Sequence, residues 1–400
     1  MAANLRDRLR RIQENKKNEN SVPESVREER KILVMDGWNP CGYLTTKREV
    51  SVALPFDVQS SLPPALAILV PDCRKLPAPS DFLFFDLETT GLSGGAGTVA
   101  FLAAFGRPVK GKLLITQYLL LDYPGESDFI EAVLGEFKNE ESVIVTYNGK
   151  CFDSQILKTR CLMNGVQPPE YLHADLLHPA RRLWKNVVGD CSQGSIETRI
   201  LGLDRSGDTP GALAPEIWFE FLRTGATERL IGICDHNCAD ISGLASILAA
   251  MISIAADPFV AGIRYDPERL ALYWRNFSVL EKDVFPAPVF DELKEKGERL
   301  LRLAAENCPR AAFVYALDQL RCGNFEEGRK RLLAISKSDF PDAIKAAALR
   351  SLAIDSEKRR DIAEALDFTK RGLKLLSENI SLKLEFEKRM QRLEKKLTYP

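Results

Sequence analysis

The chain has 400 residues, of which 45% are hydrophobic and 28% charged, and its formal net charge at pH 7 is −1. A globular chain of this length is expected to hold two or three domains and to bury a sizeable core. The near-zero charge excludes bulk attraction to a polyanion, so a nucleic acid would need a local patch or bound metal ions. No apolar run of about 18 residues is apparent, which argues against a membrane span, and no membrane partner is expected.

The cysteines predict a reducing compartment. All nine are scattered and none forms a Cys-x-x-Cys pair, so free thiols are expected rather than disulfides or zinc ligands. Residues 1–20 are charged rather than apolar, unlike a secretory signal. We therefore expect a cytoplasmic protein.

Residues 1–80 are predicted to form a short helix and an extended lead-in. Residues 3–17 have the spacing of an amphipathic helix, and a docking or frayed helix is favoured over a nucleic-acid-binding one. Residues 20–80 are irregular and contain many prolines, so we expect them to wrap the domain that follows.

A strand and helix pattern begins at residue 81. Strands are predicted at 82–88, 98–105, 112–121, 143–147 and 171–175, with helices near 126–138 and 152–164 and mostly helical sequence up to 253. Three consecutive strands followed by helix, strand, helix, strand and helices imply a mixed α/β sheet flanked by helices. This is the order of an RNase H-like core, which we assign to residues 81–255.

The remainder, residues 256–400, is predicted to be almost wholly helical. Asn324 and Asp361 stand in similar settings 37 residues apart, each between two apolar-periodic helices. This period is near the roughly 34 residues of tetratricopeptide (TPR) helix pairs. We expect a TPR-like domain of helical hairpins that offers a surface to a partner.

Two carboxylates share one face of the first predicted strand. Asp86 and Glu88 are two residues apart in an apolar run that ends at Gly91, and alternate side chains of a strand point the same way. A carboxylate in such a strand is costly unless it is paired or bound to a cation. The pair is therefore half of a possible divalent-metal site, although solvated acids at a strand end would look the same.

A third acid, Asp153, follows the strand at 143–147 and is expected over the same sheet edge. Asn148 would hold the intervening turn or cap the helix. The fourth is Asp240, which stands four residues after His236 and thus on the same helical face. Asp235 is a rival for this position, but Asp240 is preferred because it lies one turn inside the helix.

Four converging carboxylates are the ligands that Mg²⁺ or Mn²⁺ prefers. Two such ions would activate a water and stabilise the leaving oxygen in phosphodiester cleavage. A neutral histidine nearby can accept a proton from water at physiological pH, which suits His236.

These residues carry a family resemblance. Three segments resemble the motifs of DEDD-type (DnaQ-like) exonucleases: Asp86-x-Glu88-Thr89-Thr90-Gly91, Asp153 and His236-x-x-x-Asp240. Three others resemble the YprB-type bacterial branch: Gly94-Gly95-Ala96-Gly97-Thr98, Tyr147-Asn148-Gly149-Lys150 and residues 175–184. The histidine stands at the spacing that many DEDD enzymes give to a tyrosine, which also fits that branch.

The resemblance implies roles for these positions. Asp86, Glu88, Asp153 and Asp240 would be the metal ligands of a catalytic centre in which His236 is the general base. The candidate nucleic-acid contacts are Thr89 near the terminal nucleotide, Asn148, the phosphate-binding Lys150, Arg181, Arg182 and Lys185, and the stacking platform Trp184. A solvated helix face with Trp184 buried explains the last four equally well.

The function expected from this resemblance is a metal-dependent 3′→5′ exonuclease that acts on DNA in repair. Two alternatives stay open: an RNA-processing exoribonuclease, and a TPR-type adaptor whose nuclease fold is vestigial. The metal and phosphate chemistry of DNA and RNA cleavage is shared, so the sequence does not separate these substrates. A helicase is the partner that the resemblance suggests for the helical tail.

Overall fold

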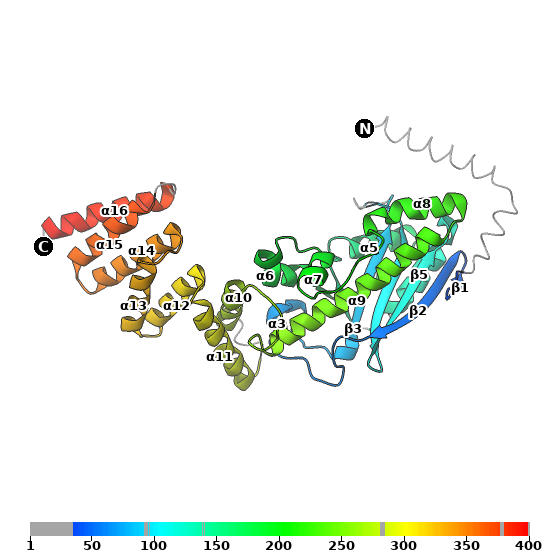
Figure 1. The fold of residues 1–400 in the computed structure, drawn as a ribbon, viewed down its shortest axis with the longest axis horizontal. Coiled ribbons are helices and arrows are strands. Elements are labelled where there is room, and N and C mark those ends of the chain that lie inside the picture. Colours follow the sequence, from blue (N-terminus) through cyan, green and yellow to red (C-terminus); the bar gives the residue numbers. More distant parts are fainter. Residues whose placement is uncertain are drawn as a thin grey trace, which may run out of the picture. The chain divides into compact units, whose positions relative to one another are not determined.

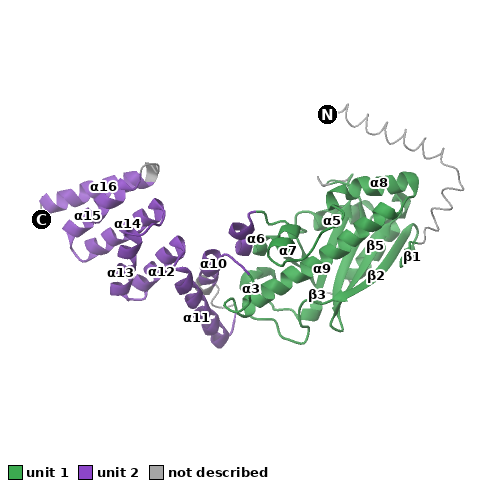
Figure 2. Cartoon of the chain, viewed as in Figure 1, with its two compact units in different colours: residues 1–180, 190–263 green, residues 181–189, 264–400 purple. Residues whose placement is uncertain are grey.

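A computed structural model describes residues 35–91, 95, 97–137, 139, 141–280, 285–376 and 380–398. The predicted helix at 3–17 lies outside these residues, as do Gly94 and Ala96. The chain divides into two compact units (Figure 2). Unit 1 comprises residues 1–180 and 190–263, and unit 2 comprises residues 181–189 and 264–400. The predicted boundaries at 80 and 255 stay predictions.

Unit 1 is built on a seven-stranded mixed sheet with the order β1-β2-β5-β4-β3-β6-β7 (Figure 1). Its strands are β1 (Asn39–Gly42), β2 (Thr45–Ala53), β3 (Phe82–Thr89), β4 (Ala100–Val109), β5 (Lys112–Leu120), β6 (Val143–Thr146) and β7 (Leu172–Asp175). The pairs from β1 to β3 are antiparallel, whereas β3/β6 and β6/β7 are parallel. The predicted mixed sheet flanked by helices is confirmed.

The lead-in predicted at 20–80 is wrong for residues 39–53. These residues form β1 and β2, and β2 pairs with β5 along its whole length from Thr45 to Ala53. The segment contains Lys47, Arg48 and Glu49, which lower its resemblance to a buried strand. Its strand conformation is therefore set by the long-range pairing with β5, from Thr45 with Leu120 to Ala53 with Lys112.

Helices flank the sheet of unit 1. The α-helices are α3 (Leu66–Leu69), α4 (Glu126–Leu134), α5 (Asp153–Met163), α6 (Leu177–Val188), α7 (Gln193–Arg199), α8 (Ala214–Thr224) and α9 (Glu228–Ala256). Short 3₁₀ helices occur at Pro71–Cys73, Pro79–Asp81, Tyr123–Gly125, Gly135–Phe137 and Gly211–Leu213. Helix α6 begins in unit 1 and ends in unit 2.

The long helix α9 packs on β3, β4 and β5 (Figure 1). It contains an 18-residue window with a mean hydropathy of 1.8, so the expectation that no segment has the composition of a membrane span was wrong. However, 56% of that window is buried inside the domain. Gly106 of β4 allows this close packing, because a Cβ there would lie 2.5 Å from Cγ2 of Ile241. The helix therefore has the properties of a core helix.

The two faces of β3 differ in chemistry. Leu83, Phe85 and Leu87 belong to the main hydrophobic cluster, where the Phe85 ring stacks on Phe105 at 5.0 Å between centroids. By strand alternation Asp86 and Glu88 lie on the opposite face, toward α9. Apolar burial on one face thus fixes the register that presents both carboxylates on the other.

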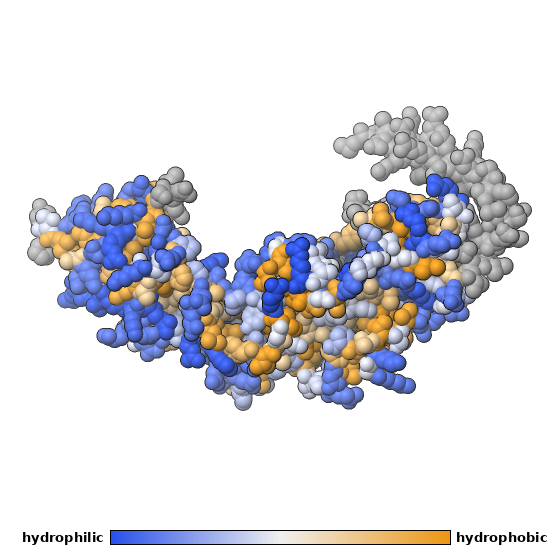
Figure 3. Space-filling model, in the orientation of Figure 1, coloured by the Kyte–Doolittle hydropathy of each residue, from blue (hydrophilic) through white to orange (hydrophobic). Residues whose placement is uncertain are grey.

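Unit 2 is helical. Its helices are α10 (Pro267–Leu280), α11 (Ala287–Ala304), α12 (Pro309–Arg321), α13 (Phe325–Ser336), α14 (Asp342–Lys358), α15 (Ile362–Lys374) and α16 (Ile380–Thr398). Consecutive helices pack together, and an alanine- and leucine-rich cluster joins α12 to α15. The surface of these helices is mainly hydrophilic in the view of Figure 3.

The 37-residue spacing marks equivalent points of two helical hairpins. Asn324 is the N-cap of α13 and Asp361 is the N-cap of α15. Each N-cap follows a residue with positive φ, namely Gly323 at +85° and Arg360 at +63°. The helical character of the tail is as predicted, and its membership of the TPR class stays a prediction.

Candidate metal and catalytic site

Strand β3 presents the first two acids of the site. Asp86 and Glu88 point to the α9 face, and Glu88 is only 9% exposed. The Asp86 Oδ2 accepts a hydrogen bond of 2.7 Å from Nδ2 of Asn237 on α9. The pairing of β3 with β4 shifts between Glu88 and Thr89, so the strand loses its regular register at the edge of the site.

The turn after β6 brings in Asp153. Asn148 adopts a left-handed conformation with φ of +68°, which asparagine tolerates better than most residues. The Asp175 carboxylate accepts hydrogen bonds from the backbone amides of Asn148 at 2.8 Å, Lys150 at 3.1 Å and Leu177 at 3.1 Å. Asp175 therefore holds this turn and also caps α6.

Asp153 is the first residue of α5 and is 4% exposed. The N-cap position is occupied by Phe152 and carries no side-chain cap, so the capping role predicted as one option for Asn148 is wrong. The Asn148 side chain is exposed instead, and its backbone holds the turn.

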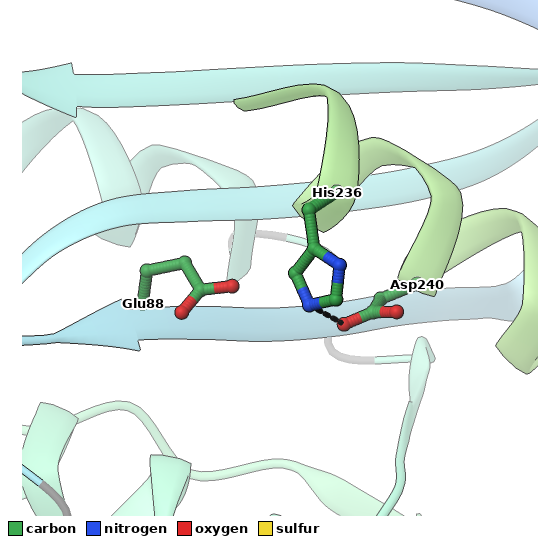
Figure 4. A group of neighbouring side chains, drawn as sticks. All are labelled: Glu88, His236 and Asp240. Carbon is green, nitrogen blue, oxygen red and sulfur yellow. Dashed lines mark ion pairs between the residues drawn. The ribbon is translucent and has the colours of Figure 1, made fainter. Parts of the chain in front are cut away.

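His236 and Asp240 project from one face of α9 toward Glu88 (Figure 4). His236 Nε2 lies 3.2 Å from Asp240 Oδ2. One ligand atom from each of Glu88, His236 and Asp240 lies within 4.8 Å of the others. The rival acid, Asp235, has a side chain that is 65% exposed and pairs with Arg48 at 2.7 Å. Asp240 is thus the acid that faces the cluster.

The loop between α7 and α8 adds residues that the sequence motifs did not indicate. Asp208 Oδ2 lies 2.8 Å from Nδ1 of His236. Arg205 pairs with Asp240, and its Nε lies 3.1 Å from Asp208 and 3.2 Å from the wholly buried Glu197. These contacts hold the loop against α9 and place a cation among the acids.

Gly211 completes this side of the site. A Cβ at Gly211 would lie 2.7 Å from Nε2 of His236, so a larger residue there would displace the imidazole. The sequence did not indicate this loop as part of the site. Its residues 204–211 read Asp-Arg-Ser-Gly-Asp-Thr-Pro-Gly, which resembles an ordinary polar loop. Only the tertiary fold shows that this loop meets His236.

Burial raises the pKa values of the clustered acids. Burial first, and then the charges of neighbouring carboxylates, raise the pKa of Asp86 and of Glu88 well above their ordinary values. Burial raises the pKa of Asp153 to about 7, partly opposed by backbone hydrogen bonds. Burial also raises the pKa of Asp240, while His236 and Arg205 oppose the rise. The clustered acids therefore hold their protons more tightly than ordinary carboxyl groups do.

The donor set fits a hard divalent cation. Asp86, Glu88, Asp153 and Asp240 offer carboxylate oxygens, the ligands that Mg²⁺ and Mn²⁺ take. A bound cation would also relieve the repulsion that raises the pKa values of Asp86 and Glu88. These residues come from a strand and two helices, so folding of unit 1 assembles the site.

The nucleic-acid contacts predicted in unit 1 lie near this site but have other partners. Thr89 is 5% exposed and its hydroxyl donates to the Gly91 carbonyl at 3.0 Å. Lys150 Nζ forms an ion pair with Asp72 at 2.7 Å, with both side chains about two-fifths exposed at 40% and 38%. Lys150 is thus accessible to a phosphate that competes with Asp72.

The four contacts predicted on α6 all lie in unit 2. Trp184 is completely buried and its indole N–H donates to the Arg264 carbonyl at 2.8 Å, so its prediction as a stacking platform is wrong. The Arg182 guanidinium lies over the Tyr273 ring at 4.4 Å, and Lys185 Nζ donates to the Gly189 carbonyl. Arg181 and Lys185 are exposed, and their contact with nucleic acid stays a prediction.

Comparisons with known proteins agree with this architecture. Residues 83–252 match the RNase H superfamily. The chain is 31% identical over 323 residues to the uncharacterized protein YprB of Bacillus subtilis (strain 168), across 79% of this chain and 75% of that protein. A solved structure of exonuclease I is 13% identical, with a TM-score of 0.28, and the match covers 74% of this chain and 99% of that one. With its nuclease-type domain, the chain belongs to the RNase H superfamily and, within it, to the family of YprB.

Proposed function

We propose that this protein is a divalent-metal-dependent exonuclease that hydrolyses DNA from the 3′ end. The proposal rests on the convergence of Glu88, His236 and Asp240, with ligand atoms within 4.8 Å, beside the half-buried Asp86 and the buried Asp153. Isolated surface acids would show neither this convergence nor such strongly raised pKa values.

Each residue has a role in this proposal. The four carboxylates would hold two cations, for which we propose Mg²⁺ or Mn²⁺. When bound, such ions supply an activated water and charge neutralisation at the phosphate. With the Asp240 carboxylate, 3.2 Å from Nε2, taken up by a cation, His236 would accept the proton of the attacking water at Nε2, because its Nδ1 is held by Asp208 at 2.8 Å.

The DNA substrate and the 3′→5′ direction rest on the DEDD-type motif pattern. Asp86-x-Glu88, Asp153 and His236-x-x-x-Asp240 follow the order of the three exonuclease motifs. On the same basis we propose a role in DNA repair and a helicase as a partner of the helical tail. The nine free cysteines are compatible with the cytoplasmic location that we propose.

The proposal can be tested with end-labelled substrates. Purified full-length protein is incubated with single- and double-stranded DNA and with RNA, each labelled at the 5′ or the 3′ end, in Mg²⁺, Mn²⁺ or EDTA. We expect a ladder of shortened 5′-labelled DNA and immediate release of the 3′ label, both abolished by EDTA. Asp86→Ala should be inactive, and Asp57→Ala, which alters an exposed loop aspartate, should match the parent.

The other outcomes separate the alternatives. Faster degradation of RNA than DNA would replace the DNA exonuclease with an exoribonuclease. Release of the 5′ label first would reverse the direction. Cleavage in EDTA, or full activity of Asp86→Ala, would contradict the metal mechanism. If no substrate is cleaved under any condition, the adaptor alternative is favoured.

A further inference from the structure

A row of side chains crosses the sheet from β2 to Asp86. The strand registers pair Arg48 with Gln117, Gln117 with Ala104, and Ala104 with Asp86. Residues paired in register point to the same face of a sheet, so these four lie in one row beneath α9. Ala104 carries only a methyl group, and Asn237 of α9 bridges the residues on its two sides.

The row is joined by short hydrogen bonds. Arg48 Nε donates to Gln117 Oε1 at 2.6 Å. Gln117 Nε2 donates to Asn237 Oδ1 and to the Cys234 carbonyl, both at 2.8 Å. Asn237 Nδ2 then donates to Asp86 Oδ2 at 2.7 Å. We call Arg48, Gln117 and Asn237 the amide relay.

The direction of donation along the amide relay is fixed by chemistry. A guanidinium has only donors, so Gln117 must turn its oxygen toward Arg48 and its NH₂ toward Asn237. Asn237 must then accept with its oxygen and offer its NH₂ to Asp86. A flipped Asn237 would place an oxygen against the carboxylate and another NH₂ against the NH₂ of Gln117. Arg48 of β2 thus sets the orientation of both the Gln117 and the Asn237 amide groups.

The relay is also rigid. Gln117 and Asn237 are completely buried, so neither amide can exchange its partners for bulk water. At the far end, Arg48 lies over the Trp38 ring at 5.2 Å and pairs with Asp235 of α9 at 2.7 Å. Both ends are therefore attached to α9, the helix that carries His236 and Asp240.

We propose that the amide relay positions the Asp86 carboxylate for metal binding, by holding Oδ2 from behind and leaving Oδ1 to the cation. Asn237 and Gln117 are positioning residues, and they act only through Asp86. This inference rests on the proposed metal-binding function. Hydrogen bonds that orient a metal-binding carboxylate typically change metal affinity or activity by about 10- to 100-fold when they are removed.

The test measures Mn²⁺ binding by the full-length protein without any nucleic acid, using isothermal titration calorimetry. Gln117→Glu keeps an acceptor for Arg48 but cannot donate to Asn237. Asn237→Leu removes the donor to Asp86 at similar volume. Tyr118→Phe is the matched control, because it removes a hydrogen bond to Glu136 from the next residue of β5. Thermal unfolding scans establish that each variant is folded.

We expect Gln117→Glu and Asn237→Leu each to raise the Mn²⁺ dissociation constant by about 10- to 100-fold, and Tyr118→Phe to leave it unchanged. The double variant should bind no more weakly than Asn237→Leu alone, because Gln117 acts through Asn237. Purely structural damage would instead weaken binding in all variants in proportion to lost stability. If Asn237→Leu does not fold, Gln117→Glu decides alone.

Two failures are distinguishable. Folded Gln117→Glu and Asn237→Leu variants that bind Mn²⁺ like the parent would overturn the amide relay and leave the proposed function intact. Absence of Mn²⁺ binding by the parent, or unchanged binding by Asp86→Asn, would overturn the proposed function and the relay with it.

Discussion

His236 is held from both sides of its ring. Asp208 lies 2.8 Å from Nδ1, and Asp240 lies 3.2 Å from Nε2. Once a bound cation occupies the Asp240 carboxylate, the carboxylate on Nδ1 selects the tautomer that leaves Nε2 able to accept a proton. Gly211 adds a steric boundary close to Nε2. The reactive position of the imidazole is therefore defined by a loop that lies outside the recognised motifs.

This arrangement predicts a kinetic effect for Asp208. Asp208→Asn keeps the size of the side chain, but its amide can stabilise the wrong tautomer of His236, so kcat should fall by about 10- to 1,000-fold while KM changes little. Asp204→Asn, in the same loop but exposed and bonded to Ser206, should match the parent. Equal kcat values for the Asp208 and Asp204 variants in steady-state assays would contradict this role.

The acids also predict a pH dependence of stability. Burial raises the pKa of Asp153 to about 7 from an ordinary 3.8, so the folded state binds this proton more tightly than the unfolded state. Without metal, that contribution to stability is present below pH 3.8 and is lost as pH rises through 7. Asn mimics the protonated acid, so Asp153→Asn in EDTA should be more stable than the parent at pH 8.

The gap between Asp153→Asn and the parent should shrink at pH 5, where Asp153 of the folded parent is largely protonated. Chemical denaturation at the two pH values measures it. Glu141→Gln, which alters an exposed side chain, serves as the control and should show no pH-dependent gap. A gap for Asp153→Asn that is the same at both pH values would show that the raised pKa is not its cause.

The residues of the site were predictable from the sequence to different degrees. Asp86 and Glu88 were found because strand alternation places them together, and His236 and Asp240 because helical spacing does. Asp208 and Asn237 were not found, because their roles depend on contacts with residues 28 and 151 positions away in the chain. No local periodicity records such contacts.

At the scale of elements, apolar content decided which predictions succeeded. Strand β3 begins with the apolar run Phe82–Phe85 and β6 with Val143–Val145, and both strands were predicted close to their observed bounds. Strand β2 was missed because it carries charged residues, and its conformation depends on pairing with β5. Trp184 was ambiguous for a related reason: the sequence shows an aromatic residue on a basic helix but not the side to which it points.

The helical hairpins of unit 2 predict a conformational effect at Gly323. This glycine has φ of +85°, and a Cβ there would contact nothing within 4 Å. Gly323→Ala should therefore destabilise unit 2 only through the left-handed backbone, by about 1 kcal/mol. Arg360→Ala changes the equivalent position, which already carries a side chain at φ +63°, and should alter stability little. Equal losses for both variants in denaturant titrations would contradict this.

At the scale of the whole molecule, the residues of the proposed metal site belong to one of the two units. The proposed metal ligands all lie in unit 1, and unit 2 consists of packed helices. The fold class could be predicted because strand and helix periodicities follow one another in the order of a mixed sheet. The assignment of residues 181–189 to unit 2 could not be predicted, because one continuous helix, α6, spans the two units.

This division predicts a selective stabilisation by metal. Calorimetric scans of the full-length protein should resolve the unfolding of unit 1 from that of unit 2. Free Mn²⁺ at about 100 times its dissociation constant should stabilise unit 1 by roughly 2.7 kcal/mol. The transition of unit 2 should not move, and Asp86→Asn should remove the effect. A shift of the unit 2 transition alone would place the metal elsewhere.

We propose above all that the carboxylate cluster at Asp86 is a metal-dependent phosphodiesterase centre. The most direct test is the single-turnover cleavage rate of 5′-labelled DNA as a function of Mn²⁺ concentration, for the parent and for Asp86→Asn. We expect no cleavage in EDTA, a rate that rises and saturates with Mn²⁺, and a loss of about 1,000-fold or more in Asp86→Asn at every concentration. Cleavage by the parent in EDTA, or equal rates for the two proteins, would contradict it.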